Sequence, residues 1–262
     1  MNAGELYRAG KLSEAIEAQV ADVKAHPLDQ SKRLFLFELL LFSGELDRAR
    51  RQAESLHFAD PDLERAAANY RRLVDSEQAR RDVFEKGTSP AFFGPPSDHL
   101  KLRLEAVGCL RGGKIREAGE LLARADEATP PVSGSLNDQP FQVLRDADDL
   151  FGGILEVMAQ GRYFWAGLEQ VRVAAMNPPS FPRDLLYIPA RLELESESGE
   201  VFLPALYPGS ASHADDQVRL GRLTDWKTLE GDVTLGVGLH TYLRDDDATT
   251  LLDWREFRAG EP

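Results

Sequence analysis

The stretch Gly10-Lys11-Leu12-Ser13-Glu14-Ala15 decides the fold of the N-terminal half of this 262-residue chain, because its pattern returns twice. The second copy, Gly44-Glu45-Leu46-Asp47-Arg48-Ala49, begins 34 residues later. The third copy, Gly113-Lys114-Ile115-Arg116-Glu117-Ala118, begins 69 residues after the second, which is two periods and one residue. A fixed spacing of this length indicates a repeat architecture.

Thirty-four residues is the period of the tetratricopeptide (TPR) helical hairpin. In such a hairpin the glycine takes the left-handed backbone conformation at the turn, and the alanine lets the two helices approach closely. Pro27 and Pro61, also 34 residues apart, would separate successive hairpins because proline interrupts a helix. The sequence therefore predicts a TPR-like array, against the alternative of unrelated amphipathic helices.

Between the second and third copies the spacing is irregular. Residues 61–86 lack a turn glycine and predict one long helix, and residues 88–96 hold three prolines and a glycine, which predict a loop. The helices expected from the repeats and this interruption cover residues 2–9, 12–25, 29–42, 45–57, 61–86, 97–111 and 114–127.

After Pro131 short apolar stretches alternate with turn residues, which is typical of strands. Residues 132–138 predict a linker, Ser198-Gly199-Glu200 predicts a hairpin turn, and Pro204 predicts an edge strand or an early strand end. The expected strands cover residues 154–158, 170–175, 190–195, 201–207 and 234–243. The predicted fold class is α+β, with a TPR-like array over residues 1–131 and a small antiparallel β-rich domain or open barrel over residues 132–262.

The formal net charge of -13 disfavours nonspecific binding to nucleic acid and to anionic membranes, because both carry negative charge. A single cysteine, Cys109, excludes an internal disulfide. The N-terminus lacks the pattern of a signal peptide, and the longest apolar run, Leu34 to Phe42, is too short to span a bilayer. We therefore expect the protein in the cytoplasm.

The search for chemistry yields no catalytic, metal or cofactor site. Cys109 falls on the inner face of a predicted helix and reads as a core thiol. Residues 146–149 (Asp-Ala-Asp-Asp) resemble the start of a calcium loop, but Phe151 and Val157 stand where glycine and glutamate are needed. Helix capping or pairing with Arg145 is the favoured interpretation of these aspartates.

Three further patterns favour structural roles. Residues 213–216 (His-Ala-Asp-Asp) predict a solvated loop, and Asp245-Asp246-Asp247 predicts a charged turn. Gly236-Val237-Gly238 lacks the third glycine of a dinucleotide-binding motif. The three tryptophans are expected in the core or between the domains. They are Trp165, Trp226 and Trp254.

The second half also carries phrases that resemble the ImpE family, also called TagJ, and the likeness extends over nearly the whole chain. The most specific phrase is Gly199-Glu200-Val201-Phe202-Leu203-Pro204-Ala205-Leu206-Tyr207. The others are Leu144-Arg145-Asp146-Ala147-Asp148-Asp149-Leu150, Gly161-Arg162-Tyr163-Phe164-Trp165 and Arg183-Asp184-Leu185-Leu186.

Members of this family are accessory proteins of the type VI secretion system. The resemblance implies a non-enzymatic adaptor that binds the N-terminal helix of the small contractile-sheath subunit. It also implies a link to ClpV, the AAA+ ATPase that dismantles the contracted sheath.

A repeat array offers a concave surface, lined by the first helix of each hairpin, that can receive an amphipathic guest helix. The shared repeat positions place a mixture of aliphatic and charged residues on that surface. The partner-helix site expected from this alignment consists of Tyr7, Arg8, Leu34, Glu38, Leu41, Leu100, Arg103, Val107 and Leu110.

The sequence leaves two other functions open. In the first, the β-rich half is the functional module and binds a second protein or a small ligand. Alternatively, the chain would be a hydrolase that uses Asp146 and Asp148.

Overall fold

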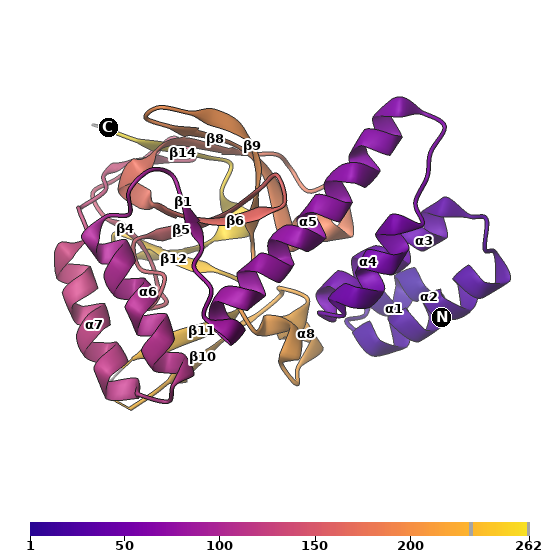
Figure 1. Ribbon diagram of the computed structural model, residues 1–262. Helices are drawn as coiled ribbons and strands as arrows, with labels where there is room; N and C mark the ends of the chain where they lie inside the picture. The colour runs from indigo at the N-terminus through magenta and orange to yellow at the C-terminus, as the bar shows by residue number, and fades with distance from the viewer. Residues whose placement is uncertain (231–232, 261–262) are drawn as a thin grey trace.

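The computed structural model describes residues 1–230 and 233–260, and its fold is α+β. Seven helices precede most of the sheet, and they confirm the predicted helices to within three residues at each end (Figure 1). They are α1 (Ala3–Arg8), α2 (Leu12–Ala25), α3 (Gln30–Phe42), α4 (Leu46–Glu54), α5 (Pro61–Lys86), α6 (Asp98–Arg111) and α7 (Ile115–Ala128).

The glycines of the three repeated stretches stand at the turns between paired helices. Gly10, Gly44 and Gly113 have φ angles of 76°, 72° and 72°, the left-handed conformation that glycine adopts most readily. Each turn brings two consecutive helices together: α1 packs on α2, α3 on α4, and α6 on α7. The long helix α5 begins at the N-cap Asp60 and ends at Gly87, which also has a positive φ.

The strands form one large sheet and two small ones. The large sheet has nine strands in the order β1-β6-β5-β9-β8-β7-β14-β2-β3, and β1–β6 is its parallel pair while the other recorded pairs are antiparallel. Its strands are β1 (Ala91–Phe92), β2 (Gly134–Leu136), β3 (Gln139–Phe141), β5 (Ile154–Ala159), β6 (Arg162–Gly167), β7 (Val171–Met176), β8 (Tyr187–Leu194), β9 (Ser198–Pro204) and β14 (Glu256–Ala259).

The small sheets have the orders β10-β11 and β13-β12-β4. A short helix, α8 (Asp216–Arg219), lies between β9 and β10 in the sequence. The strands are β4 (Leu144–Asp146), β10 (Thr224–Thr228), β11 (Thr234–Gly238), β12 (Thr241–Arg244) and β13 (Asp247–Thr250).

Several expectations for the second half were wrong. The sheet is large rather than small, because short strands such as β2 and β14, which are distant in the sequence, pair with each other. Residues 132–138 are no linker, since they contain β2. The loop at 88–96 contributes β1 to the sheet edge. The hairpin turn precedes Ser198, where Leu194 donates to the Glu197 carbonyl.

The predicted strand at 234–243 is two strands, β11 and β12, which belong to different sheets. Pro204 ends β9 as predicted, but β9 lies between β5 and β8 and is not an edge strand.

Helix α5 connects the two ends of the molecule. Figure 1 shows α1–α4 at one end and the large sheet with α6 and α7 at the other, and the C-terminal part of α5 packs on β5 and β6. A single cluster of buried apolar side chains extends from Leu6 in α1 to Phe257 in β14. The division at residues 131 and 132 stays a prediction. Within residues 1–230 and 233–260, no helix is both long enough and apolar enough to cross a membrane.

Candidate functional site

A pocket of about 340 Å³ opens where the helices meet the sheet. Its helical wall is apolar and comes from the end of α3, from α5 and from the end of α6. The side chains on that wall are Leu41, Phe42, Phe84, Val107 and Leu110. The opposite wall comes from loops of the second half and includes Leu150, Phe151, Leu186, Leu206 and Tyr207.

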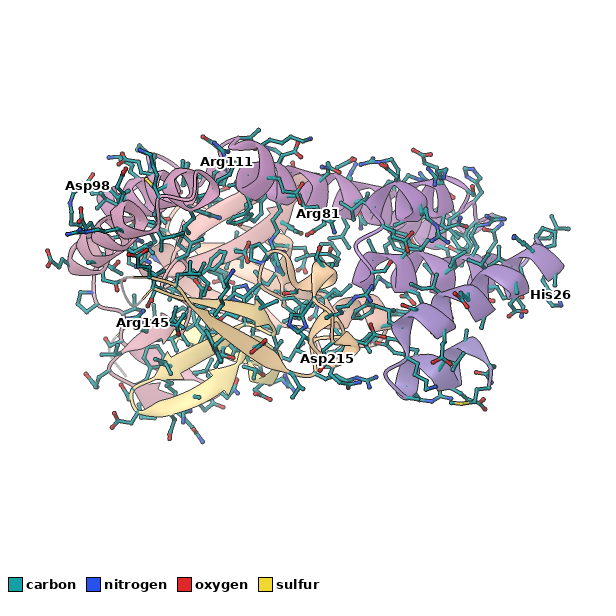
Figure 2. All side chains as sticks on the ribbon, turned by 90° about the horizontal axis from the view of Figure 1, so that it is seen from below. His26, Arg81, Asp98, Arg111, Arg145 and Asp215 are labelled. Atoms are coloured by element: carbon teal, nitrogen blue, oxygen red, sulfur yellow. The ribbon has the colours of Figure 1, made fainter. Side chains whose placement is uncertain are left out.

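Charged side chains interrupt this apolar lining. Glu77, Arg80, Arg81 and Glu85 reach the pocket from α5, and Arg111 reaches it from the end of α6. Figure 2 shows Arg81 and Arg111 on the helical side of the molecule. Glu77 and Arg80 are buried, whereas Arg81 is partly exposed and Glu85 and Arg111 are exposed. A mainly apolar lining with exposed charges beside it suits one side of an amphipathic segment.

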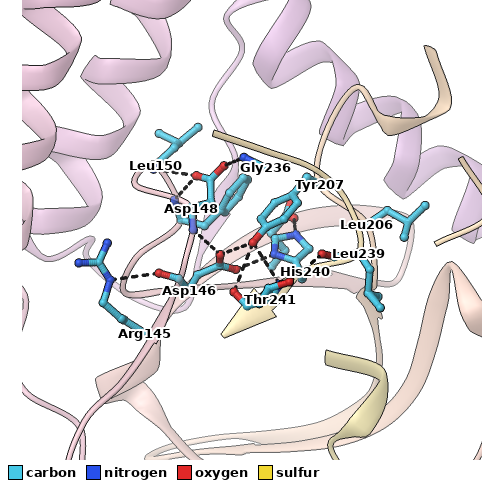
Figure 3. Close-up of polar contacts among 12 residues, drawn as sticks. Arg145, Asp146, Asp148, Leu150, Leu206, Tyr207, Gly236, Leu239, His240 and Thr241 are labelled. Carbon is cyan, nitrogen blue, oxygen red and sulfur yellow. Dashed lines mark hydrogen bonds and ion pairs between the residues drawn. The ribbon is translucent and has the colours of Figure 1, made fainter. Parts of the chain in front are cut away.

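Beneath the pocket lies a chain of buried charges that joins α5 to the sheet. Arg80 donates to both carboxylate oxygens of Glu156 in β5, each at 2.7 Å. The His240 ring lies between two carboxylates, with Nε2 2.9 Å from Glu156 and Nδ1 2.6 Å from Asp146. The Tyr207 hydroxyl donates to Asp146, and its ring lies on the His240 ring with centroids 3.9 Å apart (Figure 3).

These contacts determine which form each group takes. Burial by itself would lower the pKa of His240, but the carboxylates of Asp146 and Glu156 raise it to about 9. Burial would raise the pKa of Glu156, but the Arg80 guanidinium and the His240 ring lower it to about 2. The network therefore holds His240 as a cation and Glu156 as an anion at neutral pH.

Asp148 is buried beside this network but has a different environment. Its Oδ1 accepts from the backbone N–H groups of Leu150 and Phe151, and its Oδ2 accepts from Gly236 at 2.6 Å (Figure 3). Burial, and next the neighbouring Asp146 carboxylate, raise the pKa of Asp148 to about 7. These bonds fix the loop at residues 148–151, which supplies part of the pocket wall.

Comparison with known proteins shows the family of this chain. The type VI secretion system accessory component TagJ of Pseudomonas aeruginosa is 35% identical over 257 residues, which cover 98% of this chain and 90% of the relative. This chain belongs to the ImpE family. The family model described as ImpE protein matches residues 138–258, which include the Asp146, Glu156 and His240 network.

A solved structure has the same fold. The crystal structure of protein VPA1032 from Vibrio parahaemolyticus is 25% identical, with a TM-score of 0.91 over 99% of this chain and 98% of that chain. Family membership confirms the resemblance seen in the sequence and supports an accessory role in type VI secretion for this ImpE-family protein.

The structure brings together three of the nine residues predicted to bind a partner helix. Leu41, Val107 and Leu110 all line the pocket. Tyr7 and Leu34 are half-buried elsewhere, where Tyr7 packs on the rings of Phe35 and Phe42, and Arg8 is exposed.

Of the other three, Glu38 and Arg103 contact this chain's own second half, and Leu100 is buried. Glu38 is buried and accepts from Arg183 at 2.6 Å. Arg103 is fully buried and donates to the carbonyl oxygens of Asp149 and Leu150, and Leu100 is also fully buried. The face of the helices that the repeats predicted as concave is thus partly covered by residues from beyond position 140.

The predicted solvated loop at residues 213–216 is exposed at Ala214 and Asp215, but Asp216 begins α8, and residues 216–222 contact the first hairpin. The Asp216 carboxylate accepts from the Leu12 N–H at the start of α2, at 2.8 Å. Arg222 donates to the carbonyl oxygens of Tyr7 and Arg8 at the end of α1. Figure 2 shows Asp215 where the second half approaches the first hairpin. This segment therefore caps both helices of that hairpin.

The remaining candidates from the sequence are a cysteine, three tryptophans and a possible metal site. Cys109 is half-buried against the core. Trp165 and Trp254 are buried, and Trp226 is 39% exposed, which excludes the core for Trp226 among the two predicted placements. Among the described residues, no group of three or more His, Cys, Asp and Glu side chains could hold a metal ion.

The sequence search missed the residues that make the buried network. Glu156 stands in an otherwise apolar strand, and a charge in such a run is a signal of a buried ion pair. The partners of Glu156 could not be predicted from the local sequence, because Arg80 and His240 lie 76 and 84 residues away.

Proposed function

We propose that this ImpE-family protein is a non-enzymatic adaptor of the type VI secretion system in the cytoplasm. It binds the N-terminal helix of the small contractile-sheath subunit and thereby modulates recycling of the sheath by the AAA+ ATPase ClpV. Membership in the ImpE family and the likeness to TagJ support this role.

The observation that carries the proposal is the pocket that contains Leu41, Val107 and Leu110. A guest helix presents apolar side chains at intervals of three or four residues, and such side chains gain free energy when a preformed apolar pocket removes them from water. The two charged residues of α5 that reach solvent, Arg81 and Glu85, would meet the polar flanks of the guest.

The other six predicted contact residues lie outside the pocket and do not carry this proposal. Tyr7, Arg8 and Leu34 stay predictions. Glu38, Leu100 and Arg103 would have to give up intramolecular contacts before a guest could reach them. We further propose that the three glycine-turn hairpins are TPR-like units, and that the long helix α5 replaces one hairpin between the second and the third of them.

Calorimetry with a synthetic peptide of the sheath subunit's N-terminal helix tests the proposal. We expect a dissociation constant in the micromolar range or below, and at least tenfold weaker binding by Leu110→Asp, because the new carboxylate would have to be desolvated in the pocket. The matched control is Leu121→Asp, since Leu121 is also half-buried on a helix but does not line the pocket.

If the peptide does not bind the unmodified protein, the adaptor proposal is wrong. If the peptide binds and both variants retain full affinity, the helix binds outside this pocket.

A further inference from the structure

Strand β10 has an open edge. It pairs antiparallel with β11, and within residues 1–230 and 233–260 it pairs with no other strand. Four of its five residues are exposed, and Figure 1 shows β10 and β11 on the lower side of the molecule. An exposed strand edge presents unpaired N–H and C=O groups that can bind a further strand.

Hydrogen bonds at the two ends of β10 show which of its residues face this edge. The Leu223 carbonyl accepts from the Leu239 N–H, and the Leu229 N–H donates to the Val233 carbonyl. In an antiparallel pair, neighbouring residues of a strand point their backbone groups to opposite sides. The odd-numbered residues of β10 therefore bond to β11, and the even-numbered residues point their N–H and C=O groups outward.

The outward-facing residues are Thr224, Trp226 and Thr228. The Trp226 N–H, in the middle of the strand, donates to the side chain of the preceding Asp225 at 2.9 Å and not to β11, as this assignment requires. A bond to a flexible exposed side chain can be exchanged for a bond to a partner strand.

The sequence of β10 is complementary to itself when it is read in the opposite direction. It is Thr224-Asp225-Trp226-Lys227-Thr228, so two antiparallel copies centred on Trp226 place Thr224 opposite Thr228 and Asp225 opposite Lys227. The two-fold axis produces the aspartate–lysine pair twice. Opposite charges directly across a strand pair attract, whereas edge lysines that faced each other would prevent pairing.

The same register suits the backbone. Trp226 would face Trp226 of the second copy as a hydrogen-bonded pair, and Thr224 and Thr228 would form further pairs on either side. A register shifted by one residue would set an outward-facing residue opposite an inward-facing one and would lose this pattern.

The side chains divide between the two faces of the strand. Trp226, with its ring centroid 5.9 Å from that of Tyr207, lies on one face and is 39% exposed, so a second tryptophan would cover apolar surface. Asp225 and Lys227 lie on the other face. The Asp225 carboxylate is 3.4 Å from His213 Nε2, but at 65% exposure it stays accessible to a lysine.

We propose that two copies of this chain associate through β10, which pairs antiparallel with β10 of the second copy about a two-fold axis at Trp226. The two β10–β11 sheets then form one four-stranded sheet. A strand pair of this length is a small interface, so the dimer is weak and forms at high local concentration. The inference does not depend on the proposed function.

Sedimentation equilibrium of the full chain, from micromolar to millimolar concentration, tests the proposal. We expect a monomer–dimer equilibrium with a dissociation constant of tens to hundreds of micromolar, because the interface is below the standard size. A chain that is monomeric at every concentration overturns the proposal, and this measurement needs no variant.

Hydrogen exchange of backbone amides tests which strand edge is used. Between low and high protein concentration, exchange should slow at Trp226 and Thr228, whose N–H groups face outward, and should stay unchanged at Lys227, which bonds to β11. A dimer in which the Trp226 and Thr228 amides exchange as fast as in the monomer contradicts pairing through β10.

Two charge variants test the register. Asp225→Lys and Lys227→Asp each turn both cross-strand pairs into like-charge pairs, so each variant alone should self-associate about tenfold more weakly. A mixture of the two variants should regain the affinity of the unmodified protein, because position 225 of one variant then faces position 227 of the other with opposite charge.

Lys101→Asp is the control for these variants. It changes an exposed lysine on α6 by the same charge and should self-associate like the unmodified protein. Unchanged association of both β10 variants, or a mixture that associates no better than either variant alone, would show that the chains meet through another surface and that the proposal is wrong.

Discussion

Arg80 and Glu156, 76 residues apart, form a two-fold hydrogen-bonded ion pair with both distances at 2.7 Å. Both side chains are almost fully buried, and Arg80 also donates to the Leu206 carbonyl oxygen at 2.6 Å. One guanidinium thus joins α5, β5 and the loop that carries Tyr207. Because Arg80 also lines the pocket, this pair links the stability of the fold to the shape of the candidate site.

Replacing Arg80 should destabilise the protein strongly. Arg80→Leu leaves the buried Glu156 carboxylate without its guanidinium partner, and losing one partner of a buried pair costs about 3–5 kcal/mol. The free energy of unfolding from urea titration measures the loss. Arg50→Leu is the control, since its pair with Asp75 is exposed and is worth about 1 kcal/mol or less. Equal effects of the two changes would show that the buried pair has no special role.

Stability should fall in alkaline solution because of His240. Its pKa is raised from 6.5 to about 9 in the folded protein, so its contribution is complete below pH 6.5 and is lost as the pH rises through 9. A shift of this size corresponds to about 3 kcal/mol. Asp146, Glu156 and Tyr207 surround the ring and remain in a His240→Gln variant.

Urea unfolding at pH 6, 8 and 10 measures this dependence. His240→Gln should be less stable at pH 6 and should lose most of the decline between pH 6.5 and 9. An unchanged decline in the variant would assign it to other groups.

The turn glycines should differ in their tolerance of alanine, although their φ angles agree. Gly113→Ala should cost about 1–2 kcal/mol, the strain of the left-handed conformation, because nothing lies within 4 Å of the added Cβ. Gly44→Ala should cost about 1–3 kcal/mol more, because its Cβ would lie 2.8 Å from the Cβ of Ala211. Thermal and chemical unfolding of the two variants compare them, and equal losses would contradict this steric argument.

The acidic cluster should matter for stability rather than for hydrolysis. Asp148→Asn turns an amide N–H₂ toward backbone donors at Leu150 and Phe151 or at Gly236, and losing such a bond costs about 1–3 kcal/mol. We expect a lower melting temperature and an unchanged level of type VI secretion at a temperature where the variant stays folded. Loss of secretion by a fully folded variant would instead support the hydrolase hypothesis.

Local signals explain what could be predicted about the site. Leu41, Val107 and Leu110 were identified because the repeat period fixes which helix face each occupies, and the structure brings these three together. The repeat period also selected Glu38 and Arg103, but it gave no information on which residues cover them. Arg183 and the Asp149 carbonyl oxygen, which contact them, lie in the other half of the chain.

The sequence by itself determined the helical hairpins, their glycine turns and the family. Helix periodicity and the left-handed turn depend on residues within a few positions of one another, so they can be read along the chain. Only the tertiary structure decided the nine-stranded sheet, the Arg80–Glu156–His240 network and the pocket. Each of these depends on pairing between segments many residues apart, and the same short polar strand can be loop or sheet depending on which partner strand the fold places beside it.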